Sequence, residues 1–309
     1  DDVITLEATE VYIVDDPKRN DQNAAINAGE NILTGLDEEP KAYKDVQLVV
    51  IKAGAGDDRI EFIDSEENGE FFGTLTSDII ASGQLEGGSG NDVIIGGMGI
   101  DFLNGGEGAD TLDGMGGENT AVYASDPEGV VVDLATGVAT DGYGNIDTLL
   151  NIRNVEATSK RDILIAHPEG SILDAGDGDD DLFGGIGDDV MLSGAGADFV
   201  DGADGIDTIT YLGSKAAVYV NLSGEDVFII SPADGAVSFL AANTGFGGNA
   251  EGDRVFNVEN VQGSIFDDTL VAADISDGDI NIDGLSGNDL IIAGAAAQIM
   301  NGNQGNDWI

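Results

Sequence analysis

The sequence predicts an all-β protein in which parallel β-solenoid segments, or β-rolls, are joined by strand-rich connectors. Three observations support this prediction. Glycine and aspartate recur every nine residues in several stretches, a large apolar residue accompanies each repeat, and the segments between the stretches alternate apolar and polar residues. A fixed short period indicates a solenoid. Apolar and polar alternation indicates half-buried strands.

The composition gives the chain a large excess of negative charge and enough apolar residues for a core. Of 309 residues, 60 are Asp or Glu and 11 are Lys or Arg, so the formal net charge is -49. Nucleic acids and anionic membranes are unsuitable partners, because both require clustered basic residues. Hydrophobic residues make up 41% of the chain, whereas disordered acidic tails are depleted in them. A folded form with this charge needs counterions.

Several other protein classes are excluded. The chain has no cysteine, which rules out disulfides, zinc-thiolate sites and cysteine catalysis. It has no run of about 18 apolar residues, so no membrane-spanning helix is expected. The first residues, DDVITLEATE, lack the charged and apolar regions of a cleavable signal peptide.

Three stretches divide into nonapeptides with the pattern G-G-x-G-x-D-x-U-x, in which U is large and apolar. The first stretch begins at Gly87 and reads GGSGNDVII, GGMGIDFLN, GGEGADTLD and the decayed GMGGENTAV. The second begins at Ala175 and reads AGDGDDDLF, GGIGDDVML, SGAGADFVD and GADGIDTIT. The third begins at Gly284 and reads GLSGNDLII, AGAAAQIMN and GNQGNDWI. An isolated copy, AGAGDDRIE, carries Asp58.

The apolar residue at the eighth place is expected to point into a core. Residues seven to nine form a short strand, and its middle side chain points away from its two neighbours. Flexible Gly-rich linkers have no such apolar period. The residues expected to form the core are Ile94, Leu103, Leu112, Leu182, Met191, Val200, Ile209, Ile291 and Ile309.

These nonapeptides resemble the RTX, or hemolysin-type, calcium-binding repeat family over about 80–125, 157–211 and 280–309. The resemblance implies a calcium-filled parallel β-roll in which two nonapeptides complete one turn. Loops on one edge are then eighteen residues apart, and an ion lies between two of them. Glycines allow tight turns and leave carbonyl oxygens uncovered, and the sixth-place side chain adds a carboxylate. Ligation by oxygen alone in flexible loops suits Ca²⁺ better than Mg²⁺ or transition metals.

Several calcium ions are therefore expected along the edges of the rolls. Gln298 takes the sixth place on one edge of the third stretch, where we expect a poor site. The expected pairs of sixth-place ligands are Asp92 with Asp110, Asp101 with the weaker Asn119, Asp180 with Asp198, Asp189 with Asp207, and Asp289 with Asp307. The glycines expected to shape these sites are Gly88, Gly90, Gly97, Gly99, Gly106, Gly108, Gly176, Gly178, Gly185, Gly187, Gly194 and Gly196.

The pattern divides the chain into six segments. Tyr123 and Tyr211, 88 residues apart, mark equivalent positions of a repeated module. The segments are a strand-rich N-terminal part with one isolated repeat (1–77), a first roll (78–123), a connector (124–156), a second roll (157–211), a second connector (212–263) and a third roll (264–309) that is expected to continue beyond Ile309. The second connector holds an insertion, 224–251, which is either a tolerated surface loop or a partner contact through its aromatic residues Phe228, Phe239 and Phe246.

No catalytic motif is present, and we expect no enzymatic activity. His167 is the only histidine and lies in AHPEG, which reads as a solvent-facing turn. The sequence contains no HExxH zinc helix, nucleophile elbow or phosphate-binding loop. Paired carboxylates are too frequent here to indicate a glycosidase.

Two functions remain open. In the first, the chain is an extracellular, calcium-binding structural or adhesive protein of a bacterial cell surface, similar to RTX adhesins and surface-layer proteins, that contacts other copies of itself or cell-surface components. In the second, it is the calcium-binding, secretion-assisting region of a larger secreted enzyme or toxin. Three successive modules favour the first. Both imply folding on calcium after export, by a type I route whose signal is expected beyond Ile309.

Overall fold

The computed structural model describes residues 10–14, 25–26, 48–55, 59–61, 82–230, 237–273, 280–294 and 298–309. The described residues form short strands and one 3-10 turn, η1 (Gly248–Ala250), and contain no α-helix. None of their helical segments is long and apolar enough to cross a membrane. The chain separates into two compact units, which consist of 1–127 with 136–154 and of 128–135 with 155–309.

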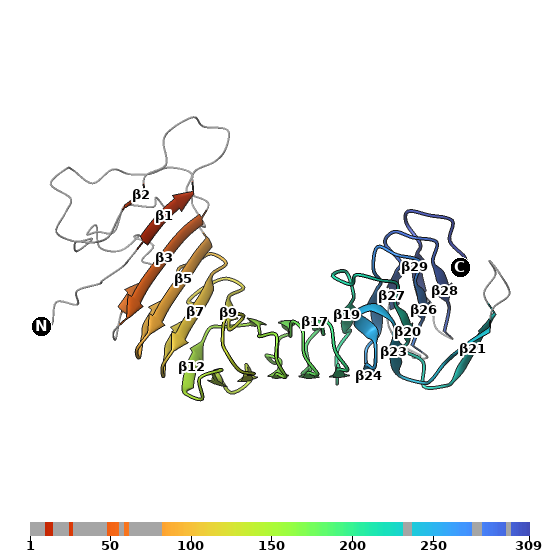
Figure 1. Ribbon diagram of the computed structural model, residues 1–309, viewed down its shortest axis with the longest axis horizontal. Helices are drawn as coiled ribbons and strands as arrows, with labels where there is room; N and C mark the ends of the chain where they lie inside the picture. Colours follow the sequence, from red (N-terminus) through yellow and green to blue (C-terminus); the bar gives the residue numbers. More distant parts are fainter. Residues whose placement is uncertain are drawn as a thin grey trace, which may run out of the picture. The chain divides into compact units, whose positions relative to one another are not determined.

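The first unit contains two sheets of mainly parallel strands (Figure 1). One has the order β2 (Ala25–Ile26), β1 (Glu10–Val14), β3 (Leu48–Ala55), β5 (Ser82–Ser89), β7 (Phe102–Glu107) and β9 (Thr120–Val122). The other has the order β11 (Val138–Thr140), β12 (Ile146–Leu150), β8 (Thr111–Asp113), β6 (Val93–Ile95) and β4 (Arg59–Glu61). Strands β3 and β4 pair in parallel with β5 and β6, so the isolated repeat forms part of the same solenoid. Its Asp58 lies outside the described residues.

The second unit repeats this arrangement with two sheets and a separate hairpin. One sheet has the order β13 (Asn154–Glu156), β15 (Ile172–Asp174), β17 (Val190–Leu192), β19 (Thr208–Thr210), β25 (Asn260–Gln262), β27 (Ile280–Asp283) and β29 (Gln298–Asn301). The other has the order β28 (Leu290–Ile292), β26 (Thr269–Val271), β20 (Tyr219–Asn221), β23 (Thr244–Phe246), β24 (Arg254–Phe256), β18 (Phe199–Asp201), β16 (Asp181–Phe183), β14 (Ile163–Ile165) and β10 (Val131–Asp133). The hairpin is β21 (Val227–Ile230) with β22 (Val237–Leu240).

The strand register gives two nonapeptides to each turn of the solenoid. Ile94 pairs with Leu112, and Leu182 pairs with Val200, eighteen residues later in each case. The eighth-place side chains stack at 0–2% exposure from Ile94 to Ile291 and form a continuous apolar core in each unit. Ile309 is the exception at 65% exposure, although a bridge from Leu290 to Trp308 joins its segment to β28.

The segments expected as connectors are lengthened coils of the same solenoid. Strand β12 pairs in parallel with β8, and β24 pairs in parallel with β18, so both sheets continue through these segments. The insertion adds β23, which runs antiparallel to β20 and β24, and the hairpin β21–β22. Phe228 and Phe239 pair across this hairpin with ring centroids 5.0 Å apart and are exposed.

Candidate metal sites

The sixth-place side chains form rows along the edges of each roll. Each Oδ1 atom accepts a hydrogen bond from the backbone N–H of the sixth-place residue one coil earlier. The N···Oδ1 distances are 2.7 Å for Asp92 to Asp110, 3.0 Å for Asp101 to Asn119, 2.9 Å for Asp180 to Asp198, 2.8 Å for Asp189 to Asp207 and 3.0 Å for Asp289 to Asp307. All five pairs expected from the eighteen-residue spacing therefore lie next to each other.

The rows continue into residues that were not singled out from the sequence. The N–H of Asp110 donates to Asp147 at 2.9 Å, and the N–H of Asp198 donates to Asp253 at 3.1 Å. Further members are Asp162, Asp268 and Glu259. A local signal was present for all five, because each stands two places before a buried aliphatic residue, as in D-x-U. These aliphatic residues are Leu149, Leu164, Val255, Val261 and Leu270.

In several members of the rows, the second carboxylate oxygen is buried without a hydrogen-bond donor or cation beside it. Burying an ionised oxygen without a hydrogen bond or counterion is costly. Buried Oδ2 atoms with no hydrogen-bond partner belong to Asp110, Asp180, Asp198, Asp207 and Asp289. All five residues are at most 2% exposed. A hard cation would satisfy these oxygens.

Burial also disfavours the charged form of these groups. It raises the pKa of Asp180 to about 8 and the pKa values of Asp110 and Asp207 to about 7, from an ordinary value of 3.8. Neighbouring carboxylates in the row add to the effect. Near neutral pH the rows therefore bind either protons or cations.

Glycines bring the loop backbones of successive coils into close contact. A Cβ atom on Gly194 or Gly196 would lie 1.4 or 1.3 Å from the carbonyl oxygen of Gly176 or Gly178. Both residues also have positive φ, 83° and 159°. The predicted glycines with positive φ are Gly88, Gly90, Gly106, Gly108, Gly176, Gly194 and Gly196, whereas Gly97, Gly99, Gly178, Gly185 and Gly187 have none. Close approach accounts for glycine at two of the places without positive φ, because a Cβ on Gly178 would lie 2.2 Å from the Lys160 carbonyl oxygen and a Cβ on Gly187 would lie 2.3 Å from the Gly170 nitrogen.

The first-place glycines lie directly beside the unsatisfied oxygens. A Cβ on Gly105 would lie 2.2 Å from Asp110 Oδ2, and a Cβ on Gly284 would lie 2.4 Å from Asp289 Oδ2. No three acidic or histidine side chains converge within the described residues. A cation here would therefore be held by one or two carboxylates and by backbone carbonyls, which is an all-oxygen set of the kind calcium accepts.

The family comparison agrees with this geometry. The family model for the RTX calcium-binding nonapeptide repeat (4 copies) matches residues 86–121, 174–209 and 276–309. These segments are RTX calcium-binding repeats. They make up about a third of the chain and contain all ten sixth-place residues that were expected as ligands. RTX repeats bind calcium and are typical of secreted proteins. No curated protein matches the chain.

Outside the RTX matches, four of the row members accept hydrogen bonds from protein groups at both carboxylate oxygens. Tyr123 and Tyr211 donate their hydroxyl groups to Oδ2 of Asp147 and Asp253, at 3.1 and 2.9 Å. Asp162 and Asp268 accept backbone and hydroxyl hydrogen bonds from Thr158 and Ser264, respectively. These hydrogen bonds come from the protein itself and do not require a cation at the four side chains.

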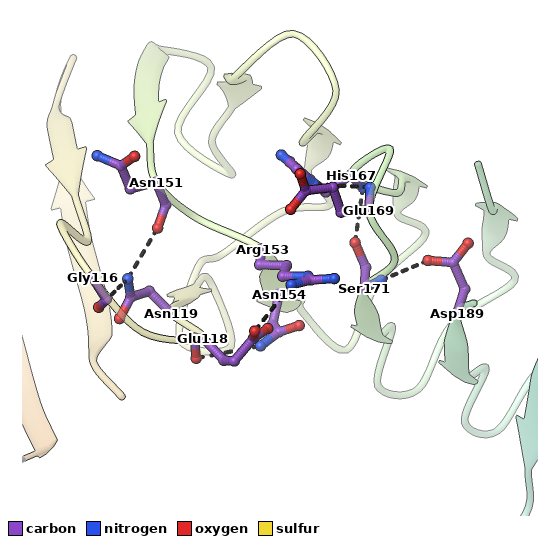
Figure 2. A network of polar contacts seen from close by, with 10 residues as sticks. All are labelled: Gly116, Glu118, Asn119, Asn151, Arg153, Asn154, His167, Glu169, Ser171 and Asp189. Atoms are coloured by element: carbon purple, nitrogen blue, oxygen red, sulfur yellow. Dashed lines mark hydrogen bonds and ion pairs between the residues drawn. The ribbon is translucent and has the colours of Figure 1, made fainter. Parts of the chain in front are cut away.

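Three expected sites differ from the simple pattern. Asp101 and Asp189 direct Oδ2 to the N–H groups of Gly97 and Gly185, at 2.7 and 3.0 Å. Asn119, which was expected to be a weak metal ligand, uses both polar atoms of its amide in hydrogen bonds within the protein, and those with Gly116 and Asn151 are drawn in Figure 2. The side chain of Gln298 lies outside the described part of the structure.

Proposed function

We propose that the chain is a calcium-binding structural or adhesive part of a bacterial extracellular or cell-surface protein that folds on calcium after export. The buried, unpartnered Oδ2 atoms along the RTX rows are the observation that supports it most strongly. With a formal net charge of -49, the chain also needs cations to bring these loops together. A calcium-poor cytosol would then keep the RTX segments extended until export.

A structural or adhesive role is supported by continuity. The coils between the RTX segments add strands to the same two sheets within each unit, so these coils extend the repeats rather than interrupt them. Most acidic residues are not members of the rows, and copies of the chain therefore repel one another unless divalent ions bridge or screen them. We expect other copies of the chain or cell-surface components to be its partners.

The proposal assigns no catalysis to these residues. His167 Nδ1 accepts the N–H of Glu169 at 3.1 Å, and the His167 N–H donates to Ser171 Oγ at 2.8 Å (Figure 2). The Ser171 N–H donates to Asp189 at 2.6 Å. These contacts fit a turn that replaces an RTX loop, in which the imidazole orders its own backbone.

Calcium titration with two readouts tests the proposal. Far-UV circular dichroism should show β-structure appearing as calcium is added to chelated protein, at roughly 10⁻⁴ to 10⁻³ M for extracellular modules. Light scattering should show assembly in calcium but not in MgCl₂ or NaCl at matched ionic strength. An unchanged β-signal after complete calcium removal would refute the folding claim.

The secretion-assisting alternative predicts a different combination. RTX segments that serve only the export of a larger enzyme or toxin would fold on calcium yet stay monomeric in every salt. The acidity that lies outside the rows would then provide solubility alone. The scattering experiment therefore separates the two functions after the folding experiment has established calcium binding.

A further inference from the structure

The RTX segments of the two units end in equivalent coils that carry different chemistry. Asn119 and Asp207 are 88 residues apart, as are Tyr123 and Tyr211. Asn119 and Asp207 each occupy the sixth place of the last nonapeptide and accept a hydrogen bond at Oδ1 from the preceding row member, at 3.0 and 2.8 Å. Both are completely buried. The backbone setting is shared, so the side chains themselves account for the difference.

In the first unit, an amide nitrogen occupies the place of the second carboxylate oxygen. Asn119 Nδ2 donates to three carbonyl oxygens. They are that of Gly114 at 2.8 Å and, as Figure 2 shows, those of Gly116 at 3.0 Å and Asn151 at 3.0 Å. These partners fix the amide orientation, because a carboxamide oxygen among three carbonyl oxygens would be repelled. Three carbonyls that converge on one point form half of an oxygen cage, and the amide takes the place of a cation in it.

At the equivalent place in the second unit, a carboxylate lies beside a loop carbonyl. Asp207 Oδ2 is buried and has no hydrogen-bond partner. A Cβ on Gly202 would lie 2.1 Å from the carbonyl oxygen of Asn257 and 2.5 Å from Asp207 Oδ2, so the carbonyl and the carboxylate line one small space. Asn257 is the counterpart of Asn151, and both have left-handed backbone, with φ of 50° and 53°. The second unit therefore has a carboxylate oxygen, Asp207 Oδ2, where the first unit has the N–H donor Asn119 Nδ2.

The neighbouring residues also make the site in the second unit more negative than its counterpart in the first unit. The Asp207 N–H donates to Glu259 Oε2 at 2.8 Å, whereas the counterpart of Glu259 is Arg153. Arg153 forms an ion pair with Glu118 at 3.0 Å, and the counterpart of Glu118 is Ile206. The formal charge of the three positions is thus zero in the first unit, from Asn, Arg and Glu, and -2 in the second, from Asp, Glu and Ile.

We propose that the coil that ends RTX segment 174–209 binds a calcium ion through Asp207 and loop carbonyls, with Glu259 supplying further negative charge, and that its counterpart at the end of segment 86–121 is a metal-free closure in which the Asn119 amide replaces the ion. This inference rests on calcium binding by the RTX rows. It assigns a role to Glu259, which lies outside the RTX matches. It also explains why an amide and an arginine occur together at the first closure.

A reciprocal exchange of side chains tests the assignment. The two variants are N119D with R153E, and D207N with E259R, in the full chain. Native mass spectrometry and titration against a chromophoric chelator count the bound ions. Relative to wild type, the first variant should gain one ion and the second should lose one. The control E118Q alters charge beside Asn119 without touching the amide and should leave the count unchanged.

Thermal midpoints give a second readout that does not depend on counting. At low calcium, just above the concentration at which the wild-type chain folds, D207N should raise the midpoint relative to wild type, because its amide can donate to the Asn257 carbonyl, and N119D should lower it. At saturating calcium the signs should reverse. An unchanged ion count in both exchange variants, or midpoints that shift alike in both media, would overturn the inference. A wild-type chain that binds no calcium would instead overturn the function on which the inference rests.

Discussion

At the scale of single residues, the decisive feature is that each row carboxylate divides its two oxygens between two tasks. Oδ1 accepts a backbone N–H from the preceding coil, and Oδ2 in five residues has no partner within the protein. Removing the charge of one row member should therefore affect calcium binding more than it affects the stacking of coils.

Asp180 and its neighbour Asp179 provide a matched pair for this claim. Asp180 is buried, whereas Asp179 is an exposed residue that accepts the N–H of Ala197 at 3.0 Å. We expect D180N to raise the calcium concentration at the folding midpoint by roughly tenfold, equivalent to about 1.4 kcal/mol. D179N should change it by less than about twofold. A calcium titration followed by circular dichroism measures both, and equal shifts would contradict the row assignment.

Only part of each row can be predicted from the nine-residue period of the sequence. The ten sixth-place residues and the buried eighth-place residues follow from a period of nine, because each nonapeptide adds half a turn. Asp147 and Asp253 could not be found in this way. They follow their row partners Asp110 and Asp198 by 37 and 55 residues, and hydrogen bonding across a lengthened coil leaves no periodic trace in the sequence.

At the scale of elements, the loops determine how closely the coils can stack. The lengthened coils lie where carboxylates without a partner give way to carboxylates that accept hydrogen bonds from the protein. The glycine-rich loops let the backbones of successive turns approach closely. In the lengthened coils, the hydroxyl groups of Tyr123 and Tyr211 donate to Asp147 and Asp253. The contacts of Tyr123 with Asp147 and of Tyr211 with Asp253 should therefore contribute the same stability with and without calcium, in contrast to the carboxylates whose Oδ2 has no partner.

Tyr211 tests the closure. Its hydroxyl donates to Asp253, and its side chain is 1% exposed, so Y211F leaves a buried carboxylate oxygen short of its nearest donor. We expect a loss of about 1–3 kcal/mol in the free energy of unfolding, both in calcium and in chelator wherever residual structure is measurable. Urea denaturation gives this value. Y143F, at a tyrosine that is 46% exposed, serves as the control and should be nearly neutral.

Gly196 tests the contact between loops. An alanine methyl group would overlap the Gly178 carbonyl oxygen, so G196A must separate two adjacent coils. We expect a lower thermal midpoint and weaker calcium binding together. A Cβ on Gly213 would have no heavy atom within 4 Å, and the φ of Gly213 is not positive, so G213A should match wild type in both measurements. A G196A chain with wild-type behaviour would show that the coils are less tightly stacked than described.

At the scale of the whole molecule, protons and calcium compete for the same groups. Burial raises the pKa values of Asp110, Asp180 and Asp207 to between about 7 and about 8. Between about pH 4, where an unfolded aspartate titrates, and those values, the folded chain holds protons that the unfolded chain has released. The calcium-free fold should therefore lose stability as pH rises through this window.

Circular dichroism in chelator provides the measurement. Lowering the pH from about 8 to about 5 should increase the β-signal of calcium-free protein, because protons then neutralise the rows. At the same time the calcium affinity should fall, since each ion must displace protons. A chelated chain whose β-signal decreases on this acidification would be inconsistent with buried carboxylate rows.

The eighteen-residue register also limits how the chain can be lengthened or shortened. A deletion of one full turn, such as 181–198, would join Asp180 to Phe199 and leave every later strand in its own sheet. A deletion of one nonapeptide would exchange the two edges and move each later strand to the opposite sheet. The viable unit of insertion or deletion is therefore two repeats, and the nine-residue deletion should fold less stably than the longer one.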